Sequence, residues 1–492
     1  MVVNSLSFLL FFSVVFAVYY FVFPDKYKWK NVWLLIASYF FYGCAEWKMI
    51  PLLLVATLLF YRLGLAIGYY NDKCEKKASL LTVIGVLLGV GILLYFKYLN
   101  FFIESFGSFF NAIGLRTDWH TFSIIMPLGI SFFTFKLISY VIEVHRRRIP
   151  SCESFISFAT YISFFPTILS GPIDRPKAFL SQLESNRNFS YSMAVDGLRQ
   201  ILWGMFKKMV IADNLALITG NVWHSYHEFS GPILLLNVLF YPFQMYMDFS
   251  GYSDMAIGVG KLLGLKVAKN FNYPFLGRNI AEYWKNWHMS LTSWLTDYVF
   301  MPLNIYFRNW NKFGSVLAII ITFILIGLWH GANLTFALFG LYHGLLYIPL
   351  MYNGSFFKKT KLVESKYGTP LFRDFCKMLS TYLLVSLGLI LFASVNITEA
   401  GEYCIRMFST LIEVPTYSEI MSFVVSKNIF LCLLFFSLTI LVLEWKSRKL
   451  EYGLCLVETY RNKYVRYLIY EILVISILFL RGHTVPFMYF QF

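Results

Sequence analysis

Long apolar runs alternate along the chain with short polar or basic segments. The clearest runs cover residues 5–23, 49–70, 378–395, 428–445 and 467–480. A helix needs about 20 predominantly apolar residues to cross a bilayer whose hydrocarbon core is about 30 Å thick. The pattern therefore predicts an all-α polytopic membrane protein with roughly 10 to 12 crossings and some re-entrant pieces.

The middle of the chain is less regular, because glycine and proline interrupt its apolar runs. Such interruptions occur at residues 126–133, 164–176 and 240–254. Backbone groups freed by a broken helix are tolerated at membrane depth only when they are buried in protein or line a watery cavity. We therefore expect broken helices around an internal chamber at residues 120–350. Residues 1–119 and 359–492 are expected to supply scaffold helices, so that residues 1–492 form a single membrane domain.

Composition supports a membrane location. Hydrophobic residues make up 58% of the chain and charged residues only 14%, against about 25% charged residues in soluble proteins. Lysine and arginine number 42 against 27 acidic residues, a net charge of +15. In a membrane protein such an excess serves orientation and contact with anionic lipids, so we expect membrane lipids and no nucleic acid as partners.

Basic residues cluster after alternate apolar runs, and such clusters tend to remain on the cytoplasmic side of a membrane. This bias predicts a multi-pass protein with an extracytoplasmic N terminus. The seven cysteines form no CxxC pair, so neither a disulfide framework nor a metal site is expected. The three basic clusters are Lys26, Lys28 and Lys30, then Lys73, Lys76 and Lys77, then Arg146, Arg147 and Arg148.

His330 lies inside the longest uncharged stretch. No Asp, Glu, Lys or Arg occurs between Gly314 and Leu350, and one straight helix of that length would overshoot the bilayer. A break is expected at "HGAN", where Gly331 weakens the helix. Because burial disfavours a charged imidazole, we expect a neutral His330 that can accept a proton from a hydroxyl as a general base. The alternative is a hydrogen bond to a neighbouring carbonyl. His343 repeats the HG pair and is interpreted as structural.

A second histidine lies in an aromatic segment. His288 is at the edge of a stripe with helical spacing, which predicts one amphipathic helix at the membrane interface. His288 is expected to face protein as an interfacial packing residue. The stripe consists of Trp284, Trp287, Leu291, Trp294 and Tyr298.

Two carboxylates occur in an apolar neighbourhood together with Tyr252. Asp248 and Asp254 each cost at least about 2.5 kcal/mol near the bilayer centre unless they are paired. Arg278 and Lys285 are the candidate partners, and we interpret such ion pairs as ties between broken helices.

The familiar GxSxG, HExxH and GxxxxGK[ST] motifs do not occur in the sequence. Serine hydrolases, zinc proteases and P-loop enzymes of these types therefore gain no support. A polysaccharide or lipid transporter is an alternative of a different class. Transporters commonly carry paired repeats, whereas the WHG segment at His330 has no counterpart elsewhere in the chain.

Seven motifs occur along the chain in the order "MPLGISFFTF", "FFPTILSGPIDRP", "GMFKKMVIADNLA", "DFSGYSDMAIG", "NFNYPFLGRNIAEYWKNWHMSLTSWLTDYVFMPL", "GLWHGANLTFALFGLYHG" and "PFMYFQF". Together they resemble the membrane-bound O-acyltransferase family, within it the bacterial branch of alginate O-acetyltransferases. The resemblance implies a ring of tilted helices around a thinned, funnel-shaped centre, with His330 as the essential catalytic residue and His288 as the second polar position.

Other residues of these motifs are expected to bind substrate or shape the site. The branch usually carries two arginines where this chain has Lys285 and Asn286. A bidentate contact cannot be transferred to them, since lysine is a point charge and asparagine is neutral. The site-shaping candidates are Trp329, Asn333, Asp248, Tyr252, Asp254, Arg278, Lys285 and Trp287.

The resemblance implies an enzyme of the bacterial cell membrane. It would move an acyl group, with acetyl favoured, from a cytoplasmic thioester such as acetyl-CoA to hydroxyls of an extracytoplasmic polysaccharide. Transfer would be direct or through a hydrolase-like partner protein, and no bound cofactor is expected. The alternative within this class is transfer of D-alanine from an acyl carrier protein to teichoic acid. Both direct transfer and a transient acyl-histidine remain open.

Overall fold

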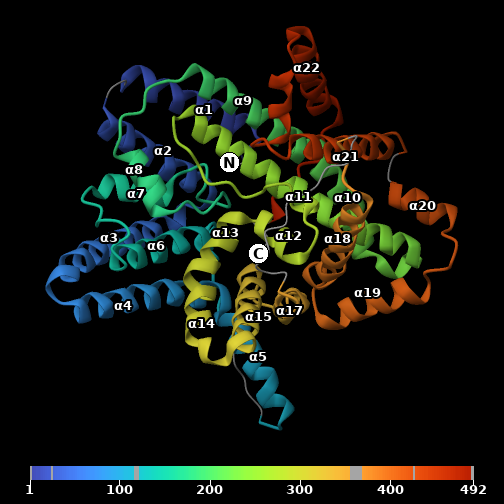
Figure 1. Ribbon diagram of the computed structural model, residues 1–492, viewed down its shortest axis with the longest axis horizontal. Helices are drawn as coiled ribbons and strands as arrows, with labels where there is room; N and C mark the ends of the chain where they lie inside the picture. Colours follow the sequence, from blue (N-terminus) through green and yellow to red (C-terminus); the bar gives the residue numbers. More distant parts are fainter. Residues whose placement is uncertain (1–2, 24–25, 116–120, 355–367, 425–426, 489–492) are drawn as a thin grey trace. The chain divides into compact units, whose positions relative to one another are not determined.

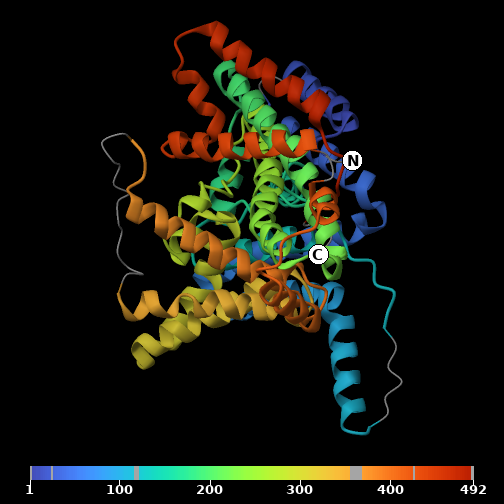
Figure 2. The ribbon, with the colours of Figure 1, turned by 90° about the vertical axis from the view of Figure 1, so that its right-hand side faces the viewer.

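The computed structural model describes the chain except for residues 1–2, 24–25, 116–120, 355–367, 425–426 and 489–492 (Figures 1 and 2). The described residues fold as helices joined by loops, which confirms the all-α class. They divide into two compact units. Unit 1 contains residues 1–201 and 256–268, and unit 2 contains residues 202–255 and 269–492. That the whole chain acts as one membrane domain stays a prediction. Part of the expected scaffold and the last four residues of the "PFMYFQF" motif lie outside the described residues.

Unit 1 is built around α6, whose residues are almost all buried. The predicted interruption at residues 126–133 is confirmed, because α6 begins only after Gly129 in a left-handed conformation (φ 72°). A Cβ there would lie 2.2 Å from the carbonyl oxygen of Ile168, so only glycine fits. The helices of this unit are α1 (Leu6–Ala17), α2 (Tyr27–Glu46), α3 (Ile50–Lys73), α4 (Glu75–Leu93), α5 (Leu99–Ala112), α6 (Ile130–His145), α7 (Phe155–Ser163), α8 (Pro176–Leu183) and most of α9 (Tyr191–Met205).

The predicted interruption at residues 164–176 is also confirmed. Helix α7 ends at Ser163 and α8 begins at Pro176, with buried irregular chain between them. The buried ammonium group of Lys136 on α6 donates to the carbonyl of Tyr161 at 3.2 Å and to the hydroxyl of Thr167 at 3.0 Å. These contacts satisfy backbone and side-chain acceptors that the broken helix leaves inside the protein.

Unit 2 contains the segments with candidate chemistry. Its helices are α10 (Asp213–His224), most of α11 (Gly231–Leu262), α12 (Ile280–Asn286), α13 (Met289–Leu295), α14 (Met301–Tyr306), α15 (Asn311–His330), α16 (Leu334–Leu345), α17 (Ile348–Tyr352), α18 (Phe372–Ala393), α19 (Ile397–Ser409), α20 (Tyr417–Val424), α21 (Lys427–Ser447) and α22 (Lys463–Leu480), together with the π-helix η4 (Phe206–Ala212).

The expected break at residues 240–254 is wrong. Helix α11 runs through this segment with Pro242 in its interior. A proline removes one backbone donor, and neighbouring helices can supply a replacement. Here the hydroxyl of Tyr382 on α18 donates to the carbonyl of Leu239, one turn before Pro242. The carbonyl that Pro242 leaves without its helical donor is that of Val238, so Tyr382 supports the backbone one residue beyond that interruption.

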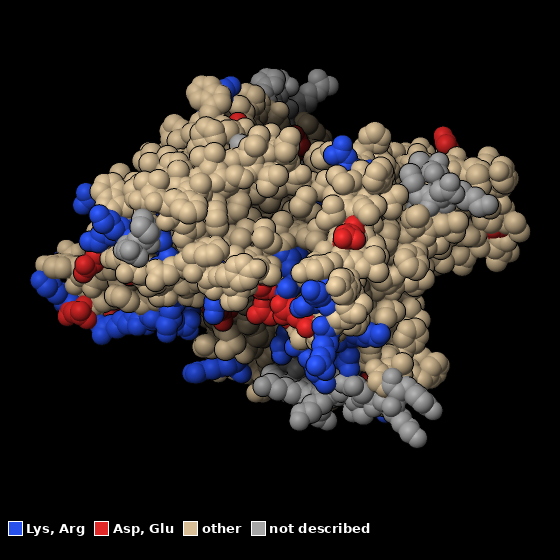
Figure 3. All heavy atoms as spheres, turned by 90° about the horizontal axis from the view of Figure 1, so that it is seen from above, with Lys and Arg blue, Asp and Glu red and all other residues tan. Residues whose placement is uncertain are grey.

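Six helical segments among the described residues are long and apolar enough to cross a membrane. The protein is therefore a polytopic membrane protein, while the total of 10 to 12 crossings stays a prediction. Broad charge-free areas of the surface in Figure 3 agree with lipid contact. The segments are Tyr27–Lys73, Glu75–Ala112, Arg308–His330, Leu334–Tyr352, Phe372–Ala393 and Phe430–Ser447, and the shorter apolar segment Leu6–Val22 precedes them.

Candidate active site

His330 is the last residue of α15, and α16 starts four residues later at Leu334. The predicted break at "HGAN" is therefore confirmed. The two helices pack backbone against backbone, since a Cβ on Gly327 would lie 1.9 Å from the carbonyl oxygen of Phe336. A Cβ on Gly331 would lie 2.1 Å from the ring of Phe336. Glycine at these positions lets α16 fold back along α15 and fixes the place where His330 ends the helix.

Aromatic side chains surround the imidazole of His330, which is 4% exposed. Its ring centroid lies 4.9 Å from that of Trp329, 5.1 Å from Phe392 on α18 and 6.4 Å from Phe339 on α16. Burial among such groups disfavours the imidazolium form. The environment therefore suits a neutral imidazole that accepts a proton only when a reacting hydroxyl is present.

The segment around His288 is not the single amphipathic helix that the aromatic stripe predicts. Helix α12 ends at Asn286, α13 begins at Met289, and His288 takes a left-handed conformation (φ 43°, ψ 52°) between them. Such backbone is strained for a residue with a side chain and persists only where its surroundings hold it. The prediction that His288 faces protein is confirmed, because its side chain is 1% exposed.

Asn270 holds this turn. Its carbonyl accepts from the amide of Met289 at 2.8 Å. Its side-chain amide donates to the hydroxyl of Ser253 on α11 at 3.1 Å, and its side-chain oxygen accepts from Ser290 on α13 at 2.5 Å. Asn270 is fully buried. Asn270 is not among the residues predicted for the site, since an asparagine in a loop carries no signal of such a partnership.

The ring of His288 packs against two aromatic residues. Its centroid lies 4.6 Å from Phe249 on α11 and 5.7 Å from Trp329 on α15. Burial lowers the pKa of His288 to about 3. His288 is therefore neutral near pH 7, and it can donate or accept a hydrogen bond without carrying charge. Because Trp329 contacts both His288 and His330, one indole links the two histidine turns.

A small cavity opens beside His330. Its volume is about 10 Å³, which is room for roughly one water molecule. His343 lies in its wall and is fully buried, with its Nδ1 atom accepting a hydrogen bond from the indole of Trp284 at 3.2 Å. On one continuous helix, His343 and His330 would lie on different faces. Because the helix breaks after His330, both side chains line the same cavity. The lining residues are Met245, Tyr283, Trp284, Trp287, His330, Phe339, His343, Val385, Leu389 and Phe392.

The carboxylates of α11 have partners other than those expected. Asp254 pairs with Lys207 at 2.5 Å and Asp248 with Lys208 at 2.7 Å, and all four side chains are largely buried. Both lysines belong to η4. A Cβ on Gly251 would lie 2.8 Å from the carbonyl oxygen of Gly204, so the backbones of α9 and α11 meet here and align the two pairs.

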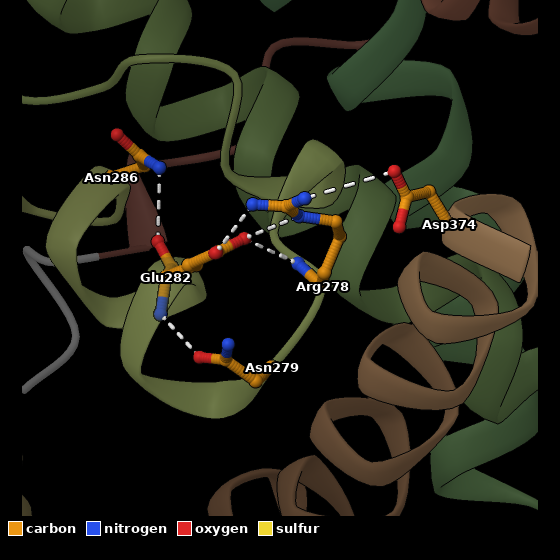
Figure 4. Close-up of polar contacts among 5 residues, drawn as sticks. All are labelled: Arg278, Asn279, Glu282, Asn286 and Asp374. Atoms are coloured by element: carbon orange, nitrogen blue, oxygen red, sulfur yellow. Dashed lines mark hydrogen bonds and ion pairs between the residues drawn. The ribbon is translucent and has the colours of Figure 1, made fainter. Parts of the chain in front are cut away.

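The expected partners Arg278 and Lys285 lie elsewhere. Arg278 pairs with Glu282 on α12 at 2.8 Å and faces Asp374 on α18 at 3.7 Å, as Figure 4 shows. This arrangement ties α12 to α18, the helix that also carries Phe392. Lys285 is exposed. The expectation that these two cations pair with Asp248 and Asp254 is therefore wrong, because the lysines of η4 already occupy that position.

Of the remaining candidates Trp287, Tyr252 and Asn333, the first lines the cavity and the other two make packing and capping contacts away from its lining. Trp287 lines it and packs on Phe271 at 5.1 Å. Tyr252 stacks on Phe487 at 4.9 Å. Asn333 caps α16 by accepting from the amide of Thr335 at 3.1 Å. Among the residues that the structure describes, no three or more His, Cys, Asp or Glu side chains gather as metal ligands.

Comparison with known proteins shows the family of the chain. A sequence model of the membrane-bound O-acyltransferase family matches residues 36–392, which include both histidine turns. The chain is 34% identical over 414 residues to the probable alginate O-acetylase AlgI of Pseudomonas aeruginosa, covering 83% of this chain and 75% of that protein. It is 32% identical over 332 residues to the peptidoglycan O-acetyltransferase of Helicobacter pylori, covering 62% of this chain and 61% of that protein.

A shorter similarity connects the chain with a different acyl group. The teichoic acid D-alanyltransferase of Streptococcus thermophilus is 34% identical over 231 residues, which cover 43% of this chain and 53% of that protein. The names of the three relatives all denote transfer of an acyl group, and they differ in the acyl group and in the polymer that is modified.

Proposed function

Since the chain belongs to the membrane-bound O-acyltransferase family, we propose that it transfers an acetyl group from a cytoplasmic thioester, such as acetyl-CoA, to hydroxyls of an extracytoplasmic polysaccharide. The observation that carries this proposal is the buried His330 at the end of α15, enclosed by aromatic side chains beside a small cavity. The protein is a multi-pass bacterial membrane protein, and we place its N terminus outside the cytoplasm on the basis of its basic loops.

His330 is the general base of this mechanism. Its neutral imidazole takes the proton of the acceptor hydroxyl while the hydroxyl oxygen attacks the thioester carbonyl. A carbon–oxygen bond forms and the carbon–sulfur bond breaks. The departing thiolate then takes the proton from His330, which returns the imidazole to its neutral form. The aromatic wall keeps water away from the thioester and so limits its hydrolysis.

His288 serves as the second polar group. Because its pKa is lowered by burial to about 3, it acts as a neutral hydrogen-bond partner and not as a cation. It orients the acceptor or polarises the thioester carbonyl. Trp329 contacts the rings of both His288 and His330 and so fixes the position of the His288 turn relative to His330. Lys207 and Lys208 are engaged in buried ion pairs, so neither lysine is assigned to the donor phosphates.

The size of the cavity favours a small acyl group. The cavity beside His330 has room for roughly one water molecule, so a small acyl group requires less rearrangement of its aromatic wall than a long acyl chain. The relatives named for alginate and peptidoglycan acetylation support a polysaccharide acceptor. An extracytoplasmic hydrolase-like partner would complete the transfer where the acceptor cannot reach His330.

A second candidate is transfer of D-alanine from an acyl carrier protein to teichoic acid. The similarity to the teichoic acid D-alanyltransferase favours it, although that similarity covers less of the chain. The two candidates share His330 as base and differ in donor and acceptor. Supplying either donor to the same preparation separates them.

The test is release of free coenzyme A from labelled acetyl-CoA by the purified protein in lipid, with labelled acetyl followed into added polysaccharide. His330→Ala is compared with wild type, and the exposed His224 provides the matched control His224→Ala. Loss of a general base lowers turnover by about 100-fold to 10,000-fold, and the control should match wild type. Full turnover in His330→Ala would contradict the role of His330. If neither acetyl-CoA nor a D-alanyl carrier protein gives turnover, even with the partner protein added, the proposed acyltransferase activity is contradicted. That result would favour a transporter.

A further inference from the structure

The last described residues of the chain, Gly482–Met488, form an extended segment within unit 2. We call it the C-terminal segment. Its amide at Gly482 donates to the carbonyl of Met209 on η4 at 2.9 Å. His483, Thr484 and Pro486 are exposed, whereas Phe487 is 2% exposed. The segment is therefore held by its main chain and by one buried aromatic side chain.

A buried charge cluster binds the main chain of this segment. Lys208 on η4 pairs with Asp213 on α10 at 2.8 Å and with Asp248 on α11 at 2.7 Å, and its ammonium group also donates to the carbonyl of Val485 at 3.1 Å. Asp248 accepts from the amide of Met488 at 3.1 Å. Asp213 accepts from the backbone amide of Val485.

The binding is reciprocal. Two buried carboxylates share one lysine, so Lys208 alone leaves the cluster with an excess negative charge inside the protein. A backbone amide of the C-terminal segment gives each carboxylate a further hydrogen-bond donor, and Lys208 in turn satisfies a carbonyl of the segment. Hydrogen bonds to charged groups are stronger than those between neutral groups and are costly to lose once the groups are buried. The cluster thus recognises main-chain groups rather than particular side chains of the segment.

Phe487 connects this segment to the proposed active site. Its ring stacks on Tyr252 at 4.9 Å and packs against Phe249 at 5.7 Å. Phe249 in turn meets His288 edge-on at 4.6 Å. His288 has a strained backbone conformation, which needs support from its surroundings. The seated segment supplies part of that support through a single intervening ring.

We propose that Lys208, Asp213 and Asp248 form a main-chain clamp for the C-terminal segment, and that the clamped segment positions His288 through Phe487 and Phe249. Phe487 is a positioning residue, since it acts on His288 through Phe249. The positioning half rests on the proposed function, while the clamp does not depend on it. Asp248 and Tyr252 therefore belong to the seat of the chain's own C-terminal segment.

The clamp is tested by hydrogen exchange of residues 482–488 in the full-length protein in lipid nanodiscs. Asp248→Asn and Phe487→Ala should each speed exchange of these amides by about tenfold or more, because each removes an interaction with a buried partner. Phe487→Tyr keeps the ring and should exchange like wild type. Thr484→Ala, in the same segment but exposed, is the matched control. Unchanged exchange in both Asp248→Asn and Phe487→Ala would overturn the clamp.

Positioning is tested on the same variants with two readouts. Phe487→Ala should lower kcat by about tenfold to 100-fold while leaving the KM for the donor nearly unchanged, as expected for a misplaced catalytic group, and Phe487→Tyr should restore kcat. The rate at which diethyl pyrocarbonate modifies His288, followed by mass spectrometry, should rise in Phe487→Ala and not in Thr484→Ala. If Phe487→Ala speeds amide exchange of residues 482–488 but leaves the modification rate of His288 unchanged, the proposal that the segment positions His288 is overturned. Since modification needs no turnover, an inactive wild type would contradict the proposed function alone.

Discussion

The imidazole of His288 meets the indole of Trp329 at 67°, with ring centroids 5.7 Å apart. Trp329 immediately precedes His330 and also touches its ring. The left-handed turn after α12 and the end of α15 are therefore coupled through one side chain, although 42 positions separate the two histidines in the printed sequence. Any change that moves the His288 turn is expected to reach His330 through the same contact.

Asn270→Ala should loosen the His288 turn. The change removes one side-chain hydrogen bond to Ser253 and one from Ser290, both buried, so the expected loss of stability is about 2–3 kcal/mol. Turnover per folded molecule should fall by about tenfold or more because His288 is displaced. Thermal unfolding and the acetyl transfer assay measure the two effects. Asn221→Ala, at an exposed asparagine, should change neither, and equal behaviour of the two variants would show that Asn270 has no special role.

Stability should fall in mild acid because of His288, which lies outside the six spans. Burial lowers the pKa of His288 to about 3, whereas a histidine in an unfolded chain has a pKa of about 6.5. Between these values the unfolded chain binds a proton that the folded protein does not, so stability declines as pH falls below about 6.5. In His288→Asn the decrease in melting temperature from about pH 7.5 to about pH 5 should be smaller than in wild type. An identical decrease in both proteins would show that His288 titrates normally in the folded state.

The sequence predicts well what depends on neighbouring positions. The end of α15 at His330 follows from a glycine placed in an uncharged run that is too long for one crossing. Likewise, the start of α6 follows from Gly129 and the irregular chain before α8 from its prolines. Each of these features reflects local backbone preferences, which a short stretch of sequence already contains.

Features that depend on distant partners could not be predicted. Helix α11 continues past Pro242, and its partner there, Tyr382, which donates to the carbonyl of Leu239, lies far away in the sequence. The left-handed turn at His288 is held by Asn270, which comes earlier in the chain and bonds Met289 and Ser290 directly after the turn. Asp248 and Asp254 pair with lysines upstream of α11 instead of Arg278 and Lys285 downstream, because glycines bring α9 against α11. Each case requires knowledge of which helices are neighbours, and spacing along the chain does not supply it.

Gly327→Ala should separate α15 from α16. The new methyl group would lie 1.9 Å from the carbonyl oxygen of Phe336, a distance that backbone atoms can relieve only by moving apart. Such overpacking costs about 1–3 kcal/mol or more, and it should lower turnover because α15 ends at His330. Gly401→Ala on α19 is the control, since nothing lies within 4 Å of its Cβ position. Alanine there should stabilise the helix slightly, so thermal unfolding should shift in opposite directions for the two variants.

The pair formed by Lys207 and Asp254 should prove structural. Lys207→Met leaves a carboxylate buried without its cation, a change that typically costs about 3–5 kcal/mol. Combining it with Asp254→Leu removes both charges, so the double variant should recover most of the lost stability, as replacement of buried ion pairs by apolar residues often does. Thermal unfolding of the two single variants, the double variant and wild type gives the coupling free energy.

Turnover per folded molecule should remain within about threefold of wild type in the double variant, since neither residue is among those that line the cavity beside His330. A double variant that is as stable as wild type yet inactive would instead place the carboxylate of Asp254 in the chemistry.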